Sequence, residues 1–216
     1  MSVHSVLFAI YLAIALYPGL VSHEYAHALV ADRLGDHAPR NEGRLTLNPK
    51  AHIDTFGSVV LPGLLLAFVA VGVPVVPFAY AKPMPQNPFA LKNPNRDSTL
   101  IALAGSGANL AMAVVAGLIL RAVPAIGQVH RFVLAWLFMN LILCVFNLMP
   151  IPGLDGARII ARYLPPRARE VYTNLDQYLV LFMLVIFFLL GAPVIAIVNG
   201  LTGALCQILA GAGCSI

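Results

Sequence analysis

Residues 5–33 read SVLFAIYLAIALYPGLVSHEYAHALVADR, an apolar run that ends in a cluster of ionisable side chains. The segment from Ser5 to Ser22 carries no charge, and about 20 apolar residues suffice for a helix to span a bilayer. His23, Glu24 and His27 follow directly. Each ionisable group inside a membrane helix costs on the order of 3 kcal/mol, so this cluster requires a shared explanation.

The rest of the chain is similarly apolar. Of its 216 residues, 60% are hydrophobic and 10% are charged, whereas roughly a quarter are charged in an ordinary soluble domain. Further apolar stretches of near-spanning length occupy residues 59–80, 99–120, 132–149 and 178–198. We therefore predict an all-α integral membrane protein, a multi-pass helical bundle in which residues 1–216 form a single membrane-embedded domain. The first run lacks a basic n-region and a cleavage site, so we expect it to remain in the mature protein.

The positions of the basic residues indicate an orientation in the lipid bilayer. The net charge is +4, and most Lys and Arg residues fall in three loops, 33–50, 82–96 and 158–169. This distribution argues against nucleic-acid binding, and the positive-inside rule places the three loops in the cytoplasm. We expect a cell-membrane protein with its N-terminus outside and the His-Glu cluster toward the cytoplasmic side.

Two apolar stretches do not fit a single crossing. If the helix at 99–120 starts inside, residues 57–80 must begin and end on one side, and their Pro and Gly residues favour a re-entrant pair of half-spans. Residues 178–213 are long enough for one spanning helix, interrupted near Gly191 and Pro193, plus a second span or an interfacial piece. A short amphipathic helix is expected at about 156–164.

The three cysteines indicate neither a disulfide framework nor a thiolate metal site. Cys144, Cys206 and Cys214 lie in or beside apolar segments and form no CxxC pair. We expect all three to be packing residues.

The spacing of the ionisable cluster predicts a zinc site. His23 and His27 are four residues apart, hence on one helix face, and Glu24 lies about 100° round the helix, within reach of water at the metal. In metallohydrolases with this HExxH pattern the metal lowers the pKa of water toward about 7, and the glutamate takes its proton. Catalytic zinc usually has three protein ligands, so a third must lie elsewhere in the chain.

Asp155 is the strongest candidate for the third ligand. It lies in FNLMPIPGLDG, residues 146–156, where two prolines end a spanning helix and Gly156 permits close approach of the backbone. A carboxylate at that depth is costly unless it binds a cation. Among the other histidines, His4 and His130 lie toward the external side, and His37 and His52 are expected to be exposed loop residues.

Two motifs together resemble the site-2 protease family of intramembrane zinc metalloproteases. HEYAH at 23–27 and NLMPIPGLDG at 147–156 match the family patterns HExxH and NxxPxPxLDG, and GRLTLNPKAHID at 43–54, YAKPMPQNP at 80–88 and AGSGANL at 104–110 look like its small bacterial and archaeal members. The resemblance implies that His23, His27 and Asp155 bind one Zn²⁺ per chain, that Glu24 is the general base, and that Asn147 holds the substrate backbone or the oxyanion. Members commonly have AGPxxN where this chain has Ala104 to Asn109, which weakens any role for Asn109. PDZ and CBS domains are expected to be absent.

Residues 43–48, GRLTLN, alternate polar and apolar side chains, which predicts a short strand beside the zinc site. A protease must draw a transmembrane helix into an extended form, and an edge strand carrying Leu45 and Leu47 could pair with it. The alternative is a hairpin that only caps the end of the first helix.

Together these features predict an intramembrane zinc endopeptidase that cleaves a transmembrane protein substrate within or near its membrane segment. Two other classes remain open. One is a catalytically silent relative that binds transmembrane helices as a scaffold. The other is a metal transporter, although no second ionisable cluster lies deep in the remaining apolar stretches.

Overall fold

The computed structural model describes residues 3–61, 63–64, 81–82, 84–123 and 126–214, and the regular secondary structure in these ranges is entirely helical. Seven α-helices carry the architecture: α1 (Val3–Arg33), α2 (Ala38–Asn41), α4 (Pro94–Ala122), α5 (Gln128–Asn147), α6 (Asp155–Ala161), α7 (Pro166–Asn174) and α8 (Leu179–Ala210). Short turns of other helix types join them: η1 (Pro49–Ala51), η2 (Thr55–Val60), η3 (Pro88–Ala90), η4 (Leu175–Tyr178) and η5 (Gly211–Cys214).

The helices predicted at 5–33, 99–120 and 132–149 are all present. The expected first helix, 5–33, is α1, which runs unbroken through Pro18, and the expected helices at 99–120 and 132–149 are α4 and α5. Among the described residues, three segments are long and apolar enough to cross a membrane: Pro94–Ala122, Gln128–Asn147 and Gly191–Ala210. The expected short helix at 156–164 is α6.

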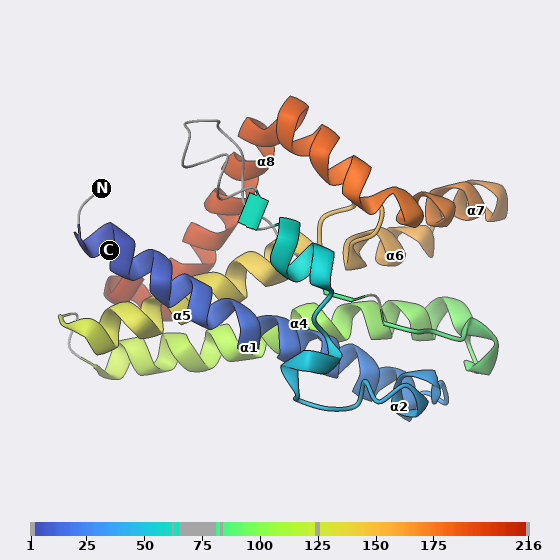
Figure 1. Ribbon diagram of the computed structural model, residues 1–216, viewed down its shortest axis with the longest axis horizontal. Coiled ribbons are helices and arrows are strands. Elements are labelled where there is room, and N and C mark those ends of the chain that lie inside the picture. Colours follow the sequence, from blue (N-terminus) through green and yellow to red (C-terminus); the bar gives the residue numbers. More distant parts are fainter. Residues whose placement is uncertain (1–2, 62, 65–80, 83, 124–125, 215–216) are drawn as a thin grey trace.

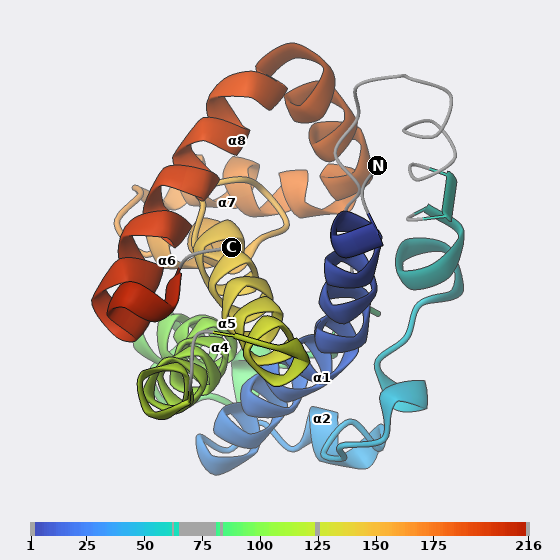
Figure 2. The same cartoon turned by 90° about the vertical axis from the view of Figure 1, so that its left-hand side faces the viewer.

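Helices α1, α4 and α5 lie side by side and form the centre of the bundle (Figures 1 and 2). The second half of α8 packs against α4 and α5, where a shared apolar core excludes water. That core consists of Ala113, Ala116, Leu120, Leu134, Leu137, Leu141, Cys206 and Ala210. This packing holds α8 against α4 and α5, the two helices that also lie against α1.

The C-terminal apolar tail forms one helix, α8, with Pro193 inside it. Figures 1 and 2 show that its ribbon turns sharply partway along its length. Proline has no amide hydrogen and its ring crowds the preceding turn, so a proline inside a helix is a usual cause of such a bend. The predicted interruption near Gly191 and Pro193 is therefore a bend, and a 3₁₀ turn rather than a second span follows the helix.

The strand predicted at 43–48 is wrong. These residues form turns and bends, and no strand is present in the part of the chain that the structure describes. Local bonds satisfy the backbone instead: Asn48 N donates to Thr46 Oγ1, and Lys50 N donates to Asn48 Oδ1, both at 3.1 Å. Such side-chain acceptors compete with a strand ladder, and a strand without a partner is unstable.

The expectation that all three cysteines are packing residues is also wrong for two of them. Cys206, on α8, and Cys214, in η5, form a disulfide, whereas Cys144 is a buried free thiol as expected. The helix stops at Gly211, whose positive φ of 57° turns the chain back toward Cys206. The re-entrant arrangement predicted for 57–80 falls largely on residues 65–80, which lie outside the described ranges.

Candidate metal centre

Helix α1 brings its two histidines together on one face. His23 and His27 are both 4% exposed, and their Nε2 atoms lie 3.0 Å apart. Residues four apart in an α-helix are neighbours on its surface, so this proximity follows from the sequence spacing. The rings stand nearly perpendicular, with their centroids 4.5 Å apart.

Asp155 reaches the same point from the start of α6. Helix α5 ends at Asn147, the chain turns through two prolines, and Asp155 begins α6. Its Oδ2 lies 3.2 Å from the Nε2 atom of each histidine. Gly156 permits this placement, because a Cβ there would overlap the carbonyl oxygens of Leu148 and Met149. The glycine of the LDG sequence thus allows the start of α6 to pack directly against the residues that follow α5.

These three side chains fit a zinc ion. The distances of 3.0, 3.2 and 3.2 Å form a nearly equilateral triangle, and tetrahedral ligands about 2.0–2.1 Å from zinc lie about 3.3 Å from one another. Asp155 Oδ2 is buried and has no hydrogen-bond donor among the described residues. Two imidazoles and a carboxylate match the donor set of catalytic zinc, which leaves a fourth position for water or substrate.

Each histidine is held through its second ring nitrogen. His23 Nδ1 lies 2.7 Å from Asn109 Oδ1 on α4, and His27 Nδ1 lies 2.6 Å from the carbonyl oxygen of Ile101, also on α4. Asn109 in turn contacts Asn140 on α5. Bonds of this kind orient metal-binding imidazoles and select the nitrogen that faces the metal.

Gly105 allows α4 to approach the histidine pair. A Cβ at this position would overlap His27 Nε2 and lie 2.7 Å from His23 Cε1. Contacts that short do not occur between well-packed atoms, so any larger residue would displace a ring or the helix.

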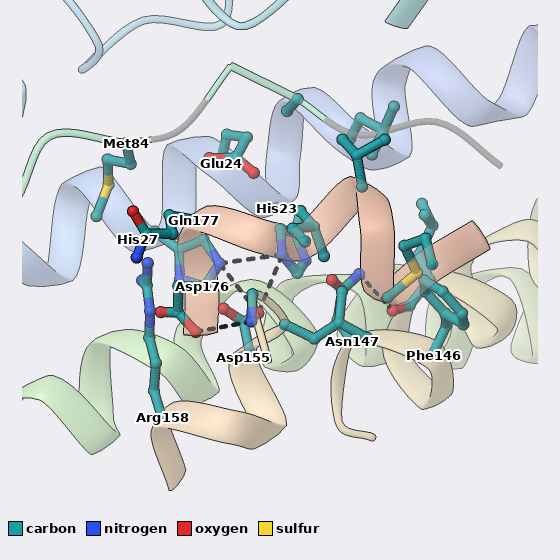
Figure 3. A pocket seen from close by; sticks show the side chains of 18 residues that line it. His23, Glu24, His27, Met84, Phe146, Asn147, Asp155, Arg158, Asp176 and Gln177 are labelled. Atoms are coloured by element: carbon teal, nitrogen blue, oxygen red, sulfur yellow. Dashed lines mark hydrogen bonds and ion pairs between the residues drawn. The ribbon is translucent and has the colours of Figure 1, made fainter. Parts of the chain in front are cut away.

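A cavity of about 350 Å³ opens beside the three side chains. Glu24 and Asn147, both predicted site residues, line it together with His23, His27 and Asp155. In Figure 3, Glu24 lies on the side of the histidine pair away from Asp155. Much of the remaining wall is apolar and includes Leu20, Met84, Leu143, Phe146, Leu154, Leu179, Val180 and Met183.

The start of α8 closes one side of this cavity. Asp176 Oδ1 accepts a hydrogen bond of 2.8 Å from the amide of Gly153, two residues before Asp155. Arg158, Asp176 and Gln177 add polar groups to the wall, as Figure 3 shows. Tyr172 Oη donates to the carbonyl oxygen of Pro150 at 2.8 Å, and burial beside Asp176 raises the pKa of this phenol. These contacts tie α7 and η4, the turn that leads into α8, to the loop before Asp155.

Some predicted residues lie elsewhere. Leu45 and Leu47, both in the described part of the chain, do not line the cavity, and Leu47 is 64% exposed. His37 is exposed, as expected, and its ring bonds to Asp32. The prediction that His52 is exposed is wrong: it is buried, and its Nε2 lies 2.8 Å from the carbonyl oxygen of Thr46.

Sequence reasoning missed the importance of two amides, Asn109 and Asn140. Both are fully buried in apolar helices, where a polar side chain needs a hydrogen-bond partner. Their position within otherwise apolar stretches could have indicated that each takes part in a buried hydrogen bond. Which helix faces they occupied could not be known without the packing of α1 against α4 and α5.

Comparison with protein families and curated proteins found one matching family and several relatives. A family model described as Peptidase family M50 matches residues 121–191, which include Asp155. YwhC of Bacillus subtilis (strain 168), a candidate zinc metalloprotease, is 35% identical over 82% of this chain and 80% of its own length.

Two further relatives are the Rip2 proteins of Mycobacterium tuberculosis (strain ATCC 25618 / H37Rv) and Mycolicibacterium smegmatis (strain ATCC 700084 / mc(2)155), also candidate zinc metalloproteases. They are 32% and 31% identical over 78% and 77% of this chain, and in both cases the match covers 62% of the relative. No solved structure matches this chain significantly.

Proposed function

Because this chain belongs to peptidase family M50, the site-2 proteases, and is a zinc metalloprotease, we propose that it hydrolyses a peptide bond within or near a transmembrane segment of another membrane protein. The observation that carries the proposal is the convergence of His23, His27 and Asp155, in a bundle of apolar helices, on one cavity that Glu24 also lines.

In this proposal His23, His27 and Asp155 hold the zinc ion. When bound there, zinc supplies Lewis-acid chemistry, which activates water and polarises a carbonyl group. Glu24 acts as the general base: its carboxylate, half-buried in the cavity, accepts a proton from the attacking water and later delivers it to the leaving amine. Asn147 contacts the substrate backbone or the developing oxyanion from the same wall.

The cavity wall supports an apolar substrate. Side chains from α1, α5 and α8, including Leu20, Phe146 and Met183, surround the polar centre. An apolar wall favours apolar side chains by about 25 cal/mol per Å² of buried surface. A segment drawn from a membrane helix supplies such side chains, whereas a soluble loop does so less often.

We further propose that the metal centre faces the cytoplasm and that both termini lie outside. Figure 1 shows α2, α6 and α7 at one end of the bundle and the C-terminal end of α8 at the other. The first end carries most basic residues of loops 33–50 and 158–169. The second carries the disulfide of Cys206 and Cys214, a bond that persists in oxidising compartments.

Two alternatives have less support. A catalytically silent scaffold has no need for an HExxH motif whose glutamate lines the metal cavity. A metal transporter needs successive sites along a path, but within the described residues His23, His27 and Asp155 form the one group of potential ligands.

The test compares Glu24→Gln with a matched surface variant, Glu42→Gln, in membranes of the native cells. Glu42 is exposed at the end of α2 and does not line the cavity. In Glu24→Gln we expect full-length substrates to accumulate and their membrane-proximal fragments to disappear, as quantified by proteomics of the membrane fraction. Purified Glu24→Gln should retain zinc, because the glutamate is not a ligand. Unchanged fragments in Glu24→Gln, or cleavage sites confined to soluble domains, would refute the proposal.

A further inference from the structure

A chain of two buried amides connects the zinc-binding face of α1 with α4 and α5. Asn109 and Asn140 are both 0% exposed, and Asn109 Oδ1 lies 2.7 Å from His23 Nδ1. We propose that Asn109 is a positioning residue that holds His23 in the tautomer with an unprotonated Nε2 toward the metal, and that Asn140 fixes the orientation of Asn109. This inference rests on the proposed zinc site.

The orientation of Asn140 follows from a backbone carbonyl. One of its amide atoms lies 2.9 Å from the carbonyl oxygen of Trp136. A carbonyl oxygen only accepts hydrogen bonds, so the atom facing it must be the NH₂ group of Asn140. The oxygen of the Asn140 amide therefore points the other way, toward Asn109.

The same reasoning then fixes Asn109. Its Nδ2 lies 3.0 Å from the carbonyl oxygen of Gly19 and 3.0 Å from Asn140 Oδ1. Both partners are acceptors, and one NH₂ group has two protons to donate, one to each. A flipped Asn109 would place its oxygen against two other oxygens and lose both bonds.

The tautomer of His23 follows in the last step. Since Asn109 presents its oxygen, the His23 nitrogen that faces it must donate, and Nδ1 carries the proton. The neutral ring then has a lone pair at Nε2. His27 reaches the same state by a simpler route, because its Nδ1 faces the carbonyl oxygen of Ile101.

The result is a site arranged for a cation. The unprotonated Nε2 atoms of His23 and His27 face each other at 3.0 Å, and both lie 3.2 Å from Asp155 Oδ2. Three acceptor atoms at these distances repel one another unless a cation lies among them. The two histidines differ in one useful respect: a main-chain carbonyl holds His27, but a replaceable side chain holds His23.

The first test needs no variant. The ¹⁵N chemical shifts of the histidine rings in the zinc-free, detergent-solubilised protein distinguish the two tautomers. We expect Nδ1 of His23 to carry a proton, as the hydrogen bond to Asn109 Oδ1 requires. A protonated Nε2 in the neutral ring would overturn the inference, and this result does not depend on whether the protein cleaves any substrate.

The second test compares zinc affinity, measured by competition with a chelator, in three variants. Asn109→Leu removes the acceptor at similar volume and should weaken zinc binding roughly 10- to 100-fold. Asn109→Asp keeps an oxygen toward Nδ1 but turns its second oxygen toward the Gly19 carbonyl and Asn140 Oδ1. It should lose stability, yet retain the His23 tautomer and bind zinc more tightly than Asn109→Leu. Thr202→Val, which replaces a buried hydroxyl without a hydrogen-bond partner among the described residues, is the matched control and should bind zinc normally.

The outcomes are distinguishable from those of the proteolysis test. If Asn109→Leu and Asn109→Asp lose zinc affinity equally, Asn109 acts only through packing and the inference is overturned. Unchanged zinc affinity in a folded Asn109→Leu protein would also overturn it. The expected tautomer and the expected order of zinc affinities, with no proteolysis in the wild type, would instead contradict the proposed function and leave the positioning role intact.

Discussion

The α-carbon of Gly105 lies against the ring of His27, so close that a Cβ would overlap Nε2. Helix α4 can therefore pass behind the proposed zinc ligands only with glycine at this position. The geometry of the metal centre therefore requires that residue 105 has no side chain.

Gly105→Ala tests this contact. The added Cβ must push either α4 or the His27 ring, so we expect zinc affinity to fall by about 10-fold or more, as for other changes behind metal ligands. Gly107→Ala, two residues along the same helix, meets nothing within 4 Å and should bind zinc normally. It should also be slightly more stable, because alanine is favoured over glycine in helices by about 1 kcal/mol. Equal zinc affinities in the two variants would contradict this account of Gly105.

The link between Asp176 and the loop before Asp155 is expected to contribute to stability. Asp176→Ala removes the acceptor of the Gly153 amide and should lower the free energy of unfolding by about 1–2 kcal/mol. That loss corresponds to a decrease of several °C in Tm, roughly 2–4 °C per kcal/mol for a chain of this size, measured in detergent.

Asp176→Asn keeps an oxygen acceptor and should behave nearly as wild type. Gln177→Ala is the control for the same turn, because among the described residues its amide bonds only to the carbonyl oxygen of Asn174, at the end of α7. If Asp176→Ala unfolds at the same temperature as Asp176→Asn, the hydrogen bond from the Gly153 amide to residue 176 does not stabilise the fold.

Much of the fold could be predicted from sequence, because apolar runs specify spanning helices almost by length alone. The first helix was predicted at 5–33 and runs from Val3 to Arg33. The strand at 43–48 failed for a reason that period-two alternation does not reveal: Thr46 and Asn48 satisfy the backbone locally, and no neighbouring strand is available among the described residues.

The candidate site was predictable where a motif fixes it and not where packing does. His23 and His27 share a face by helix geometry, and the cost of a carboxylate at membrane depth indicated Asp155. Asn109 was undervalued, because the rotation of α4 against α1 determines which side chain meets His23. The disulfide was missed for a similar reason, since only the turn at Gly211 brings Cys214 back to Cys206.

The disulfide gives a test of orientation. If the end of α8 lies outside the cell, a membrane-impermeant reductant applied to intact cells should open the Cys206–Cys214 bond, as detected by a mass shift with a maleimide reagent.

Cys206→Ser should lower the free energy of unfolding by about 2 kcal/mol, because the bond closes a short loop. Cys144→Ser, which affects a free buried thiol, is the control for the labelling pattern. A bond accessible only after the cells are lysed would reverse the proposed topology.

Asn147 offers a test of how the substrate is held. Its Nδ2 donates to the carbonyl oxygen of Leu143 at 2.8 Å, which leaves a second N–H on the same nitrogen, and the residue lines the cavity. If that N–H stabilises the oxyanion, Asn147→Ala should lower kcat by roughly 10²- to 10³-fold, whereas a contact to the substrate backbone alone should mainly raise KM. The assay uses a substrate identified by its accumulation in Glu24→Gln.

Asn147→Asp separates donation from acceptance. Its carboxylate keeps an oxygen at the same place but has no N–H, so it should lose as much activity as Asn147→Ala. Zinc affinity should be unchanged in both variants, because Asn147 does not belong to the group of three potential ligands. Wild-type kcat and KM in Asn147→Asp would show that no N–H of residue 147 acts on the substrate. The contribution of this wall of the cavity would then be its shape rather than its hydrogen bonds.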